Sequence, residues 1–301
     1  MRQDRLSLHA EVTQRVIREL EEGRLPWVQP WASSGATVGL PCNAGTGRYY
    51  SGINVLILWA EVIERGFEAQ RWLTYNQAQA LGGHVRRGEQ GTTVCYADRF
   101  VPKDEQESAR AEGREARQRA FLKRFTVFNV AQCAGLPAEM LAGAKSSPVQ
   151  EFVPIAHRVM EATGATIRIG GERAFYAPLT DHVQVPPQAA YEAPINWYRT
   201  VLHELGHWTG HWSRLDRFQD PFLDHPAYAR EELCAELASA FLCAELGIVP
   251  TVRHADYIGA WLDVLREDER AIFRAASQAS RAADYILRCC SDREGGDHAA
   301  R

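Results

Sequence analysis

Apolar residues recur at helical spacing in several long segments of the chain. In residues 5–22 they fall on one side of a helix, and Gly23 follows as a stop signal. A strongly apolar run over residues 53–65 ends at Gly66 in the same way. Further helices are expected within residues 74–83 and over residues 149–162, 194–211, 228–246, 254–265 and 268–289, followed by a frayed tail at 291–301.

Strand patterns are fewer and concentrate in the first half of the chain. Residues 92–101 and 124–131 are rich in β-branched and aromatic residues, which predicts two paired strands. The highly charged segment 103–124 between them predicts a solvated helical or mobile hairpin tip, with an arm that follows DNA as the alternative. Two short strands are expected around residues 166–171 and 182–186.

The length and the linker signal together predict two domains. A chain of 301 residues favours two domains over one, and residues 135–149 mix Gly, Pro and Ser as a linker does. The expected fold is α+β, with a small α/β domain over residues 1–140 and a mostly helical domain over residues 150–290. The first 150 residues carry a net charge of +3 and the rest −7, which permits a nucleic-acid surface on the first domain.

Composition limits the class of protein. The chain is 46% hydrophobic and 24% charged, which excludes a disordered or fibrous protein. It has no apolar run of about 18 residues and its first 25 residues are charged, so we expect no membrane span and no secretory signal. Seven scattered cysteines without a Cys-x-x-Cys pair argue against a disulfide framework. A cytoplasmic protein is expected.

The strongest chemical signal is the string His203-Glu204-Leu205-Gly206-His207. Two histidines four residues apart share one helix face, where both imidazoles can bind a single zinc ion. Glu204 flanks that face and can take a proton from a water that the metal has made acidic. Apolar residues behind the motif support a packed helix, so we predict a metal site here.

A catalytic zinc ion needs a third protein ligand. His211 continues the four-residue spacing, but three ligands along one straight helix rise about 12 Å and cannot converge on one ion. His211 is therefore expected beside the site or at the surface. The segment 228–246 offers glutamates from a second helix, with a charged helix surface as the alternative: Glu231, Glu232, Glu236 and Glu245.

At this point the sequence resembles the ArdC family of antirestriction proteins over nearly its whole length. The first half carries RYYSGINVLILW, WLTYNQAQALGG, VRRGEQGTTVCY and VFNVAQCAGL, and the second carries LHELGHWTGHWSRLDR and YAREELCAELASAFLCAELGI. The resemblance implies a single-stranded-DNA-binding domain followed by a zincin-like metallopeptidase domain, encoded on plasmids and similar mobile elements.

The resemblance also implies roles for single residues. His203 and His207 become metal ligands and Glu204 the catalytic glutamate. By similarity to gluzincin metallopeptidases, Glu232 becomes the third ligand, with Glu236 behind it. The expected cofactor is Zn²⁺, with Mn²⁺ as an alternative. Nothing is transferred onto the linker or residues 103–124.

Binding of unpaired bases requires aromatic rings close to basic groups. In the first domain, GRYYSGIN supplies such a mixture beside glycines, and residues 71–75 and 84–87 supply it again. Trp59, by contrast, is expected in the core. The candidate DNA-binding residues are Arg48, Tyr49, Tyr50, Asn54, Arg71, Trp72, Arg86 and Arg87.

Three functions remain open from the sequence. The leading one is an antirestriction protein that coats incoming single-stranded DNA and carries a zinc-dependent peptidase-type domain, with a protein or peptide as a further partner. The second is a protease that digests DNA-bound proteins. The third is a DNA-binding decoy whose metal is structural, for which Glu204 would be dispensable.

Overall fold

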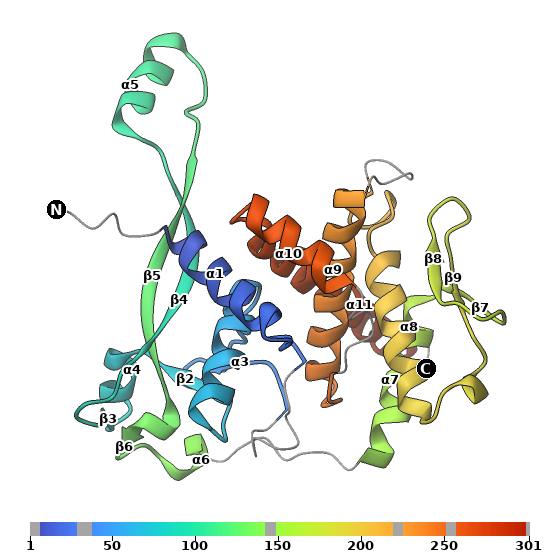
Figure 1. The fold of residues 1–301 in the computed structure, drawn as a ribbon. Coiled ribbons are helices and arrows are strands. Elements are labelled where there is room, and N and C mark those ends of the chain that lie inside the picture. Colours follow the sequence, from blue (N-terminus) through green and yellow to red (C-terminus); the bar gives the residue numbers. More distant parts are fainter. Residues whose placement is uncertain (1–6, 29–37, 142–148, 219–224, 251–256, 299–301) are drawn as a thin grey trace.

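The protein consists of a mixed α/β N-terminal half and a mostly helical C-terminal half, which confirms the predicted fold class (Figure 1). The structure is a computed structural model and describes residues 7–28, 38–141, 149–218, 225–250 and 257–298. No helix within these ranges is long and apolar enough to cross a membrane.

The N-terminal half is built around two small sheets. Its main sheet has the order β1-β2-β5-β4, and β3 pairs with β6 in a second sheet. The elements in chain order are α1 (Leu8–Glu21), β1 (Cys42–Asn43), α3 (Ile53–Arg65), β2 (Arg71–Leu73), α4 (Tyr75–Ala80), β3 (His84–Val85), β4 (Thr92–Phe100), α5 (Lys103–Glu112), β5 (Arg119–Asn129), β6 (Cys133–Ala134) and α6 (Ala138–Leu141).

The predicted strand pair is confirmed as a long antiparallel hairpin. β4 pairs with β5 over its whole length, from Thr92 opposite Val127 to Phe100 opposite Arg119. The two strands extend away from the rest of the molecule and carry α5 at their far end (Figure 1). The helical tip expected between the strands is therefore present. Its charges pair among themselves, since Arg114 Nη1 lies 2.5 Å from Glu105 Oε1.

Helix α3 has the bounds that its sequence pattern predicts. Gly52 and Gly66, at its two ends, adopt φ angles of 60° and 65°, a region that favours glycine over other residues. Most of its apolar side chains are buried. Trp59 is buried as expected and packs edge-on against Phe241 of the C-terminal half, with ring centroids 5.7 Å apart.

The C-terminal half is a helical bundle with a small sheet at one side. The sheet has the order β7-β9-β8, with β7 parallel and β8 antiparallel to β9. Its elements are α7 (Val149–Thr163), β7 (Thr166–Ile169), β8 (Phe175–Ala177), β9 (His182–Val185), α8 (Pro194–Trp208), α9 (His225–Glu245), α10 (Ile258–Glu267) and α11 (Ala271–His298).

Most helix ends lie within a few residues of the prediction, and two of the differences bear on the predicted site and tail. α8 ends at Trp208, three residues earlier than expected, and a turn follows that contains His211. α11 continues to His298, so the prediction of a frayed tail from residue 291 is wrong up to that residue. The helical spacing of apolar residues fades in the glycine-containing end of α11, so the sequence pattern did not distinguish this part of the helix from a tail.

Helix α9 lies at the centre of the bundle and packs against α8, α10 and α11. Its side chains from Glu231 to Ala244 are all buried. A helix buried on every side offers no surface for charges, so the alternative of a charged helix surface is wrong for the glutamates near its start. Buried carboxylates need partners that compensate the lost hydration.

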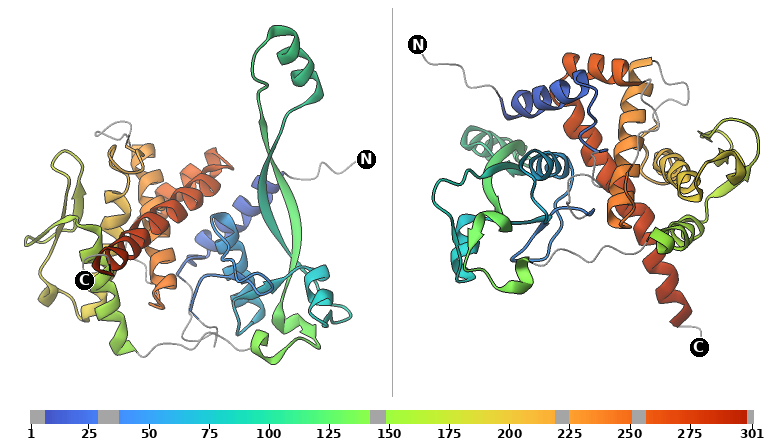
Figure 2. Two further views of the ribbon diagram at one scale, coloured as in Figure 1. Left: turned by 180° about the vertical axis from the view of Figure 1, so that it is seen from behind. Right: turned by 60° about the horizontal axis from the view of Figure 1, so that its bottom comes forward.

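The two halves share one hydrophobic core. α1 packs on α10, and the Thr13 hydroxyl donates a 2.7 Å hydrogen bond to the carbonyl of Glu269. Trp27 meets Trp261 edge-on at 5.6 Å. Figure 2 shows α1 and α3 beside the C-terminal helices in both further views. Of the predicted linker 135–149, residues 142–148 lie outside the described residues, and the domain limits 1–140 and 150–290 stay predictions.

Candidate metal centre

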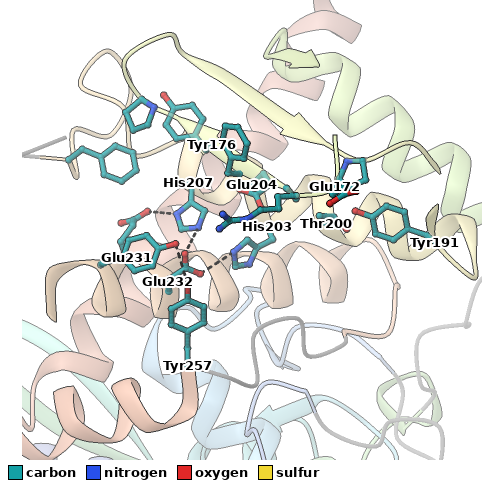
Figure 3. A pocket seen from close by; sticks show the side chains of 17 residues that line it. Glu172, Tyr176, Tyr191, Thr200, His203, Glu204, His207, Glu231, Glu232 and Tyr257 are labelled. Atoms are coloured by element: carbon teal, nitrogen blue, oxygen red, sulfur yellow. Dashed lines mark hydrogen bonds and ion pairs between the residues drawn. The ribbon is translucent and has the colours of Figure 1, made fainter. Parts of the chain in front are cut away.

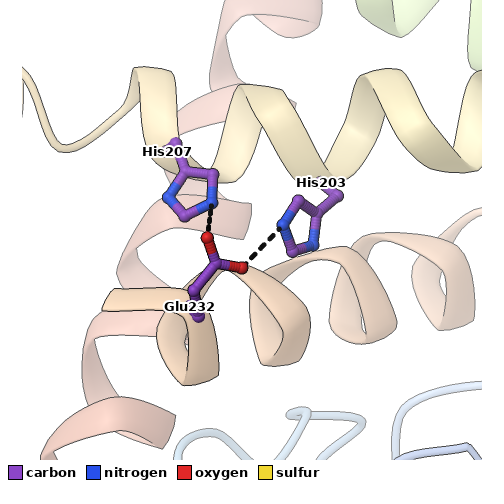
Figure 4. A group of neighbouring side chains, drawn as sticks. All are labelled: His203, His207 and Glu232. Carbon is purple, nitrogen blue, oxygen red and sulfur yellow. Dashed lines mark ion pairs between the residues drawn. The ribbon is translucent and has the colours of Figure 1, made fainter. Parts of the chain in front are cut away.

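Helices α8 and α9 approach each other closely where the two histidines lie. Gly206 makes this approach possible, because a Cβ atom there would lie 3.2 Å from Ala235 Cα and 3.3 Å from Ala235 O. His203 and His207 are one helical turn apart on α8 and direct their rings toward α9, with ring centroids separated by 4.9 Å (Figure 4). The sequence string thus forms one face of a buried helix–helix contact.

Glu232 of α9 places its carboxylate between the two imidazoles (Figure 4). Its Oε2 lies 3.5 Å from His203 Nε2, and its Oε1 lies 3.5 Å from His207 Nε2. One donor atom from each of the three residues lies within 4.8 Å of the others, and all three residues are buried. Two imidazoles and a carboxylate are the donor set of many catalytic zinc sites, so these residues fit a divalent metal ion.

In each histidine the ring nitrogen that does not face Glu232 contacts another glutamate. Glu236 Oε2 lies 3.1 Å from His203 Nδ1, and Glu231 Oε1 lies 3.3 Å from His207 Nδ1. A carboxylate on the second ring nitrogen fixes the tautomer and the orientation of a metal-binding imidazole. Glu236 was predicted behind the ligands, whereas the role of Glu231 was missed because it depends on which way α9 faces α8.

Arg217 anchors Glu231 from the turn that follows α8. Its Nη2 lies 2.7 Å from Glu231 Oε1 and 2.6 Å from the carbonyl of Gly206, and its Nη1 donates to the Thr209 hydroxyl at 2.8 Å. The side chains of Arg217 and Glu231 are only 6% and 10% exposed. This arginine therefore ties the end of α8, the glutamate and the ring of His207 into one unit.

Replacing Arg217 by methionine should destabilise the protein strongly. The substitution leaves Glu231 buried without its cation, and breaking a buried pair in this way costs about 3–5 kcal/mol of unfolding free energy. The matched control is Arg230→Met on α9, whose pair with Glu267 is exposed and worth about 0–1 kcal/mol. Urea unfolding monitored by circular dichroism measures both, and equal losses would contradict this account.

The carboxylates determine the protonation of the histidines in the metal-free protein. Burial lowers the pKa of His203, but its hydrogen bonds to Glu232 and Glu236 outweigh burial and raise that pKa to about 9. The pKa of His207 is raised to about 10 against the same burial effect by Glu231 and Glu232. The two imidazoles in turn overcome the burial of Glu232 and hold its pKa well below the usual range.

A cavity of about 620 Å³ opens onto the three donor residues (Figure 3). Glu204, 4% exposed, lines it beside the histidines. Beside Glu232 the hydroxyls of Tyr228 and Tyr257 lie 3.4 Å apart. Burial and hydrogen bonds to Tyr257 and Glu232 raise the pKa of Tyr228, so its hydroxyl stays a donor. The cavity is lined further by Glu172, Arg173, Phe175, Tyr176, Tyr191, Thr200 and Phe218.

Two of the sequence candidates lie apart from this cavity. His211 lies in the turn after α8, where its Nδ1 is 2.7 Å from the Ser213 hydroxyl, and it is absent from the described residues that line the cavity. His211 is only 8% exposed, so the alternative that it lies at the surface is wrong, and its place beside the ligands stays a prediction. Glu245 lies at the exposed end of α9, far along the helix from Glu232.

The candidate DNA-binding residues fall into accessible and inaccessible groups. Tyr49 is 61% exposed, and Arg48 and Arg87 are exposed as well. Tyr50 is half-buried against the core. Trp72 is fully buried and packs against Phe67, so it presents no face to a base, and its predicted DNA contact is wrong.

The remaining candidates serve the fold as well. The side-chain amide of Asn54 accepts from the backbone N–H of Cys95 and donates to its carbonyl, both at 2.7 Å, and so closes the edge of β4. Both ends of the amide are therefore used within the fold, and the DNA contact of Asn54 stays a prediction. Arg71 donates to the carbonyl of Glu139 at 2.8 Å, and Arg86 to Glu89 Oε1 at 3.1 Å.

Comparison with protein families assigns each half separately. Residues 7–128 match the N-terminal domain of the anti-restriction factor ArdC. Residues 154–278 match a zincin-like metallopeptidase family. The second match contains His203, His207 and Glu232.

Individual relatives cover nearly the whole chain. Two Escherichia coli proteins named DNA primase TraC are 40% and 39% identical across 93% of this chain, which spans 27% and 20% of their own lengths. An uncharacterized protein of Sinorhizobium fredii is 38% identical over 93% of this chain and 91% of its own length.

Solved structures agree with the sequence relatives. The metal-free crystal structure of the antirestriction protein ArdC from the R388 plasmid superposes with a TM-score of 0.81 and 39% identity, over 95% of this chain and 99% of that one. The Mn(II)-bound structure of that protein gives a TM-score of 0.78 and 37% identity, over 95% and 98%. The chain therefore belongs to the ArdC antirestriction family, with an ArdC N-terminal domain and a zincin-like metallopeptidase domain.

Proposed function

We propose that this protein protects incoming mobile-element DNA from restriction in the cytoplasm. In this proposal residues 1–140 bind single-stranded DNA and residues 150–290 carry a zinc-dependent peptidase-type site. The observation that carries the proposal is the buried cluster of His203, His207 and Glu232 beneath an open cavity, in a chain of which both halves match the ArdC family.

The residues around the cavity support hydrolysis of an amide bond. A divalent metal held by the three donor residues would act as a Lewis acid on a bound carbonyl and make water more acidic. Glu204 would accept the proton of the attacking water and deliver it to the leaving amine. Tyr228 and Tyr257 place hydroxyl donors beside Glu232, where they could stabilise negative charge that develops on the carbonyl oxygen.

The donor set favours zinc as the resident metal. Two imidazole nitrogens and one carboxylate oxygen suit Zn²⁺, and each imidazole is held by a glutamate that increases its basicity. Mn²⁺ is the alternative, because the related ArdC was crystallised with Mn(II). A protein or peptide is the expected substrate of this site.

The exposed arginines and tyrosines of the N-terminal half support binding of unpaired bases. Arg48 and Tyr49 follow each other in one exposed segment next to β1. A tyrosine ring can stack on a base only when that base is free of its duplex neighbours, and arginine neutralises the adjacent phosphate. Single strands should therefore be preferred over duplex.

The full-length protein should bind a fluorescein-labelled oligothymidylate more tightly than a duplex of the same length. Affinity should fall as salt rises, because each neutralised phosphate of a single strand contributes a slope of about −0.7 to log K against log salt. Fluorescence anisotropy over a salt series measures both quantities.

A variant carrying Arg48→Ala and Tyr49→Ala should lower this affinity. The matched control is Trp212→Ala, which removes a ring that is 73% exposed in the C-terminal half. Equal or tighter binding of duplex by the wild-type protein would refute the single-strand assignment.

A further inference from the structure

The β4–β5 hairpin has two chemically different faces. Residues directly opposite each other in an antiparallel pair, and residues two apart along one strand, point to the same face. Val94 is opposite Phe125 and Tyr96 is opposite Lys123, so these four share one face. Cys95, opposite Arg124, belongs to the other.

The second face is attached to the body of the protein. Arg124 Nη1 lies 2.9 Å from Glu11 Oε2 of α1, and Leu122 packs against the main core. The edge of β4 is held at Cys95 by the amide of Asn54 from α3. These contacts fix which face of the hairpin is turned to solvent.

The first face changes character along the hairpin. At Val94 it is buried, in the part of β4 that contacts α3, but beyond that point Tyr96 and Phe125 are exposed and Phe121 is half-buried. Tyr96 is 59% exposed and Phe125 46%, and their rings meet edge-on with centroids 6.1 Å apart. Lys123 Nζ lies 5.2 Å from the ring centroid of Phe121 on the same face. We call Tyr96, Phe121, Lys123 and Phe125 the stacking face.

We propose that the stacking face binds the unpaired bases of single-stranded DNA. Exposed aromatic rings grouped with a cation are what a sequence-tolerant single-strand site requires, because every base has a face on which a ring can stack. On this face the register places two basic residues, Arg119 and Lys123, and one acidic residue, Asp98, a net positive charge that favours a polyanion as the occupant. The ArdC-type domain match runs through residue 128 and so includes the whole hairpin.

This inference rests on the proposed binding of single-stranded DNA and names where the bases lie. The sequence alternative of an arm that follows DNA covered residues 103–124 and so included the start of β5. None of the single residues predicted for DNA contact lies on β4 or β5. The sequence alone could not show that these aromatic residues share one face, because that depends on the register in which β4 and β5 pair.

Aromatic pairs across two strands also stabilise a hairpin, so the test must separate stacking on DNA from stability. Tyr96→Ile and Phe125→Ile remove the rings but keep a side chain that favours β-strands. Tyr96→Phe keeps the ring and removes only the hydroxyl. Thermal unfolding of each full-length variant reports any change in stability independently of DNA.

The experiment measures anisotropy of fluorescein-labelled oligothymidylate with the full-length protein. Tyr96→Ile and Phe125→Ile should each weaken binding by about fivefold or more, as loss of one stacked ring does elsewhere. Tyr96→Phe should bind like wild type, and so should Trp212→Ala, whose ring is exposed in the C-terminal half. Lys123→Gln should reduce the salt slope by about 0.7.

The outcomes distinguish this inference from the function on which it rests. If the wild-type protein binds no oligothymidylate, the proposed single-strand function fails, and the inference fails with it. If wild type binds and both isoleucine variants keep wild-type affinity, the stacking face alone is refuted. Weakened binding by the isoleucine variants with unchanged melting temperature, and with Tyr96→Phe unaffected, supports the stacking face.

Discussion

Replacing Glu204 by glutamine should abolish peptidase activity while metal binding and DNA binding remain normal. Glutamine has almost the same shape as glutamate, and Glu204 is not one of the three grouped donor residues. Its amide, however, cannot accept the proton of the attacking water. The loss of general acid–base catalysis alone is worth about 10²–10⁴-fold in rate.

Hydrolysis of fluorescein-labelled casein by the zinc-loaded protein measures this effect. The matched control is Glu172→Gln, which changes an exposed glutamate of the same cavity and should leave the rate close to that of wild type. Metal content and oligothymidylate affinity are measured on the same samples. A Glu204→Gln protein that digests casein at the wild-type rate would rule out the assigned role.

The same variant separates the competing functions in cells. Transfer of an unmodified plasmid into a restricting host measures protection. If Glu204→Gln protects fully, protection comes from coating DNA, as expected for a binding decoy. If protection is lost while metal content and DNA affinity are normal, proteolysis is part of the mechanism, as expected for a protease that acts on DNA-bound proteins.

The sequence predicted the elements with strong periodic patterns and missed those defined by long-range pairing. The bounds of α3 follow from a strongly apolar segment between two glycines. The three-residue strand β8 was missed because it has too few residues for a pattern. The shared core was missed as well, because nothing local in α1 indicates that it packs on α10.

In the candidate site, too, residues set by a local pattern were predictable and residues set by long-range packing were not. His203 and His207 were predictable because the four-residue spacing is a local property of one helix. Glu231 was not, because both it and Glu232 follow the same local pattern and only the packing of α9 on α8 assigns one to each role. Arg217 reaches the site through a turn, which carries no periodic signal.

One DNA candidate, Trp72, was wrong for a related reason. Trp72 and Tyr49 both lie near arginines in the sequence, yet one is fully buried and the other 61% exposed. A short strand such as β2 does not reveal which of its faces meets the core. Aromatic residues that are close to basic residues in the sequence therefore indicate a DNA surface only when the aromatic side chains are known to be exposed.

Glu232→Ala should lose the metal, whereas His211→Ala should retain it. Removal of Glu232 takes away one of three protein ligands and the group that bridges the two imidazoles. His211 instead bonds Ser213 in the turn after α8. The metal affinity of Glu236→Ala should lie between those of the other two variants, about 10–100-fold below wild type, because this substitution removes only the partner of His203 Nδ1.

Elemental analysis after dialysis against buffer tests this order. The wild-type protein and His211→Ala should keep one zinc per chain, the number of ions that a single three-residue cluster holds. Metal uptake should also release protons, because both imidazoles must be neutral to bind, so affinity should fall as the pH falls. Loss of zinc from His211→Ala with retention by Glu232→Ala would mean that the third ligand lies in the turn after α8 and not on α9.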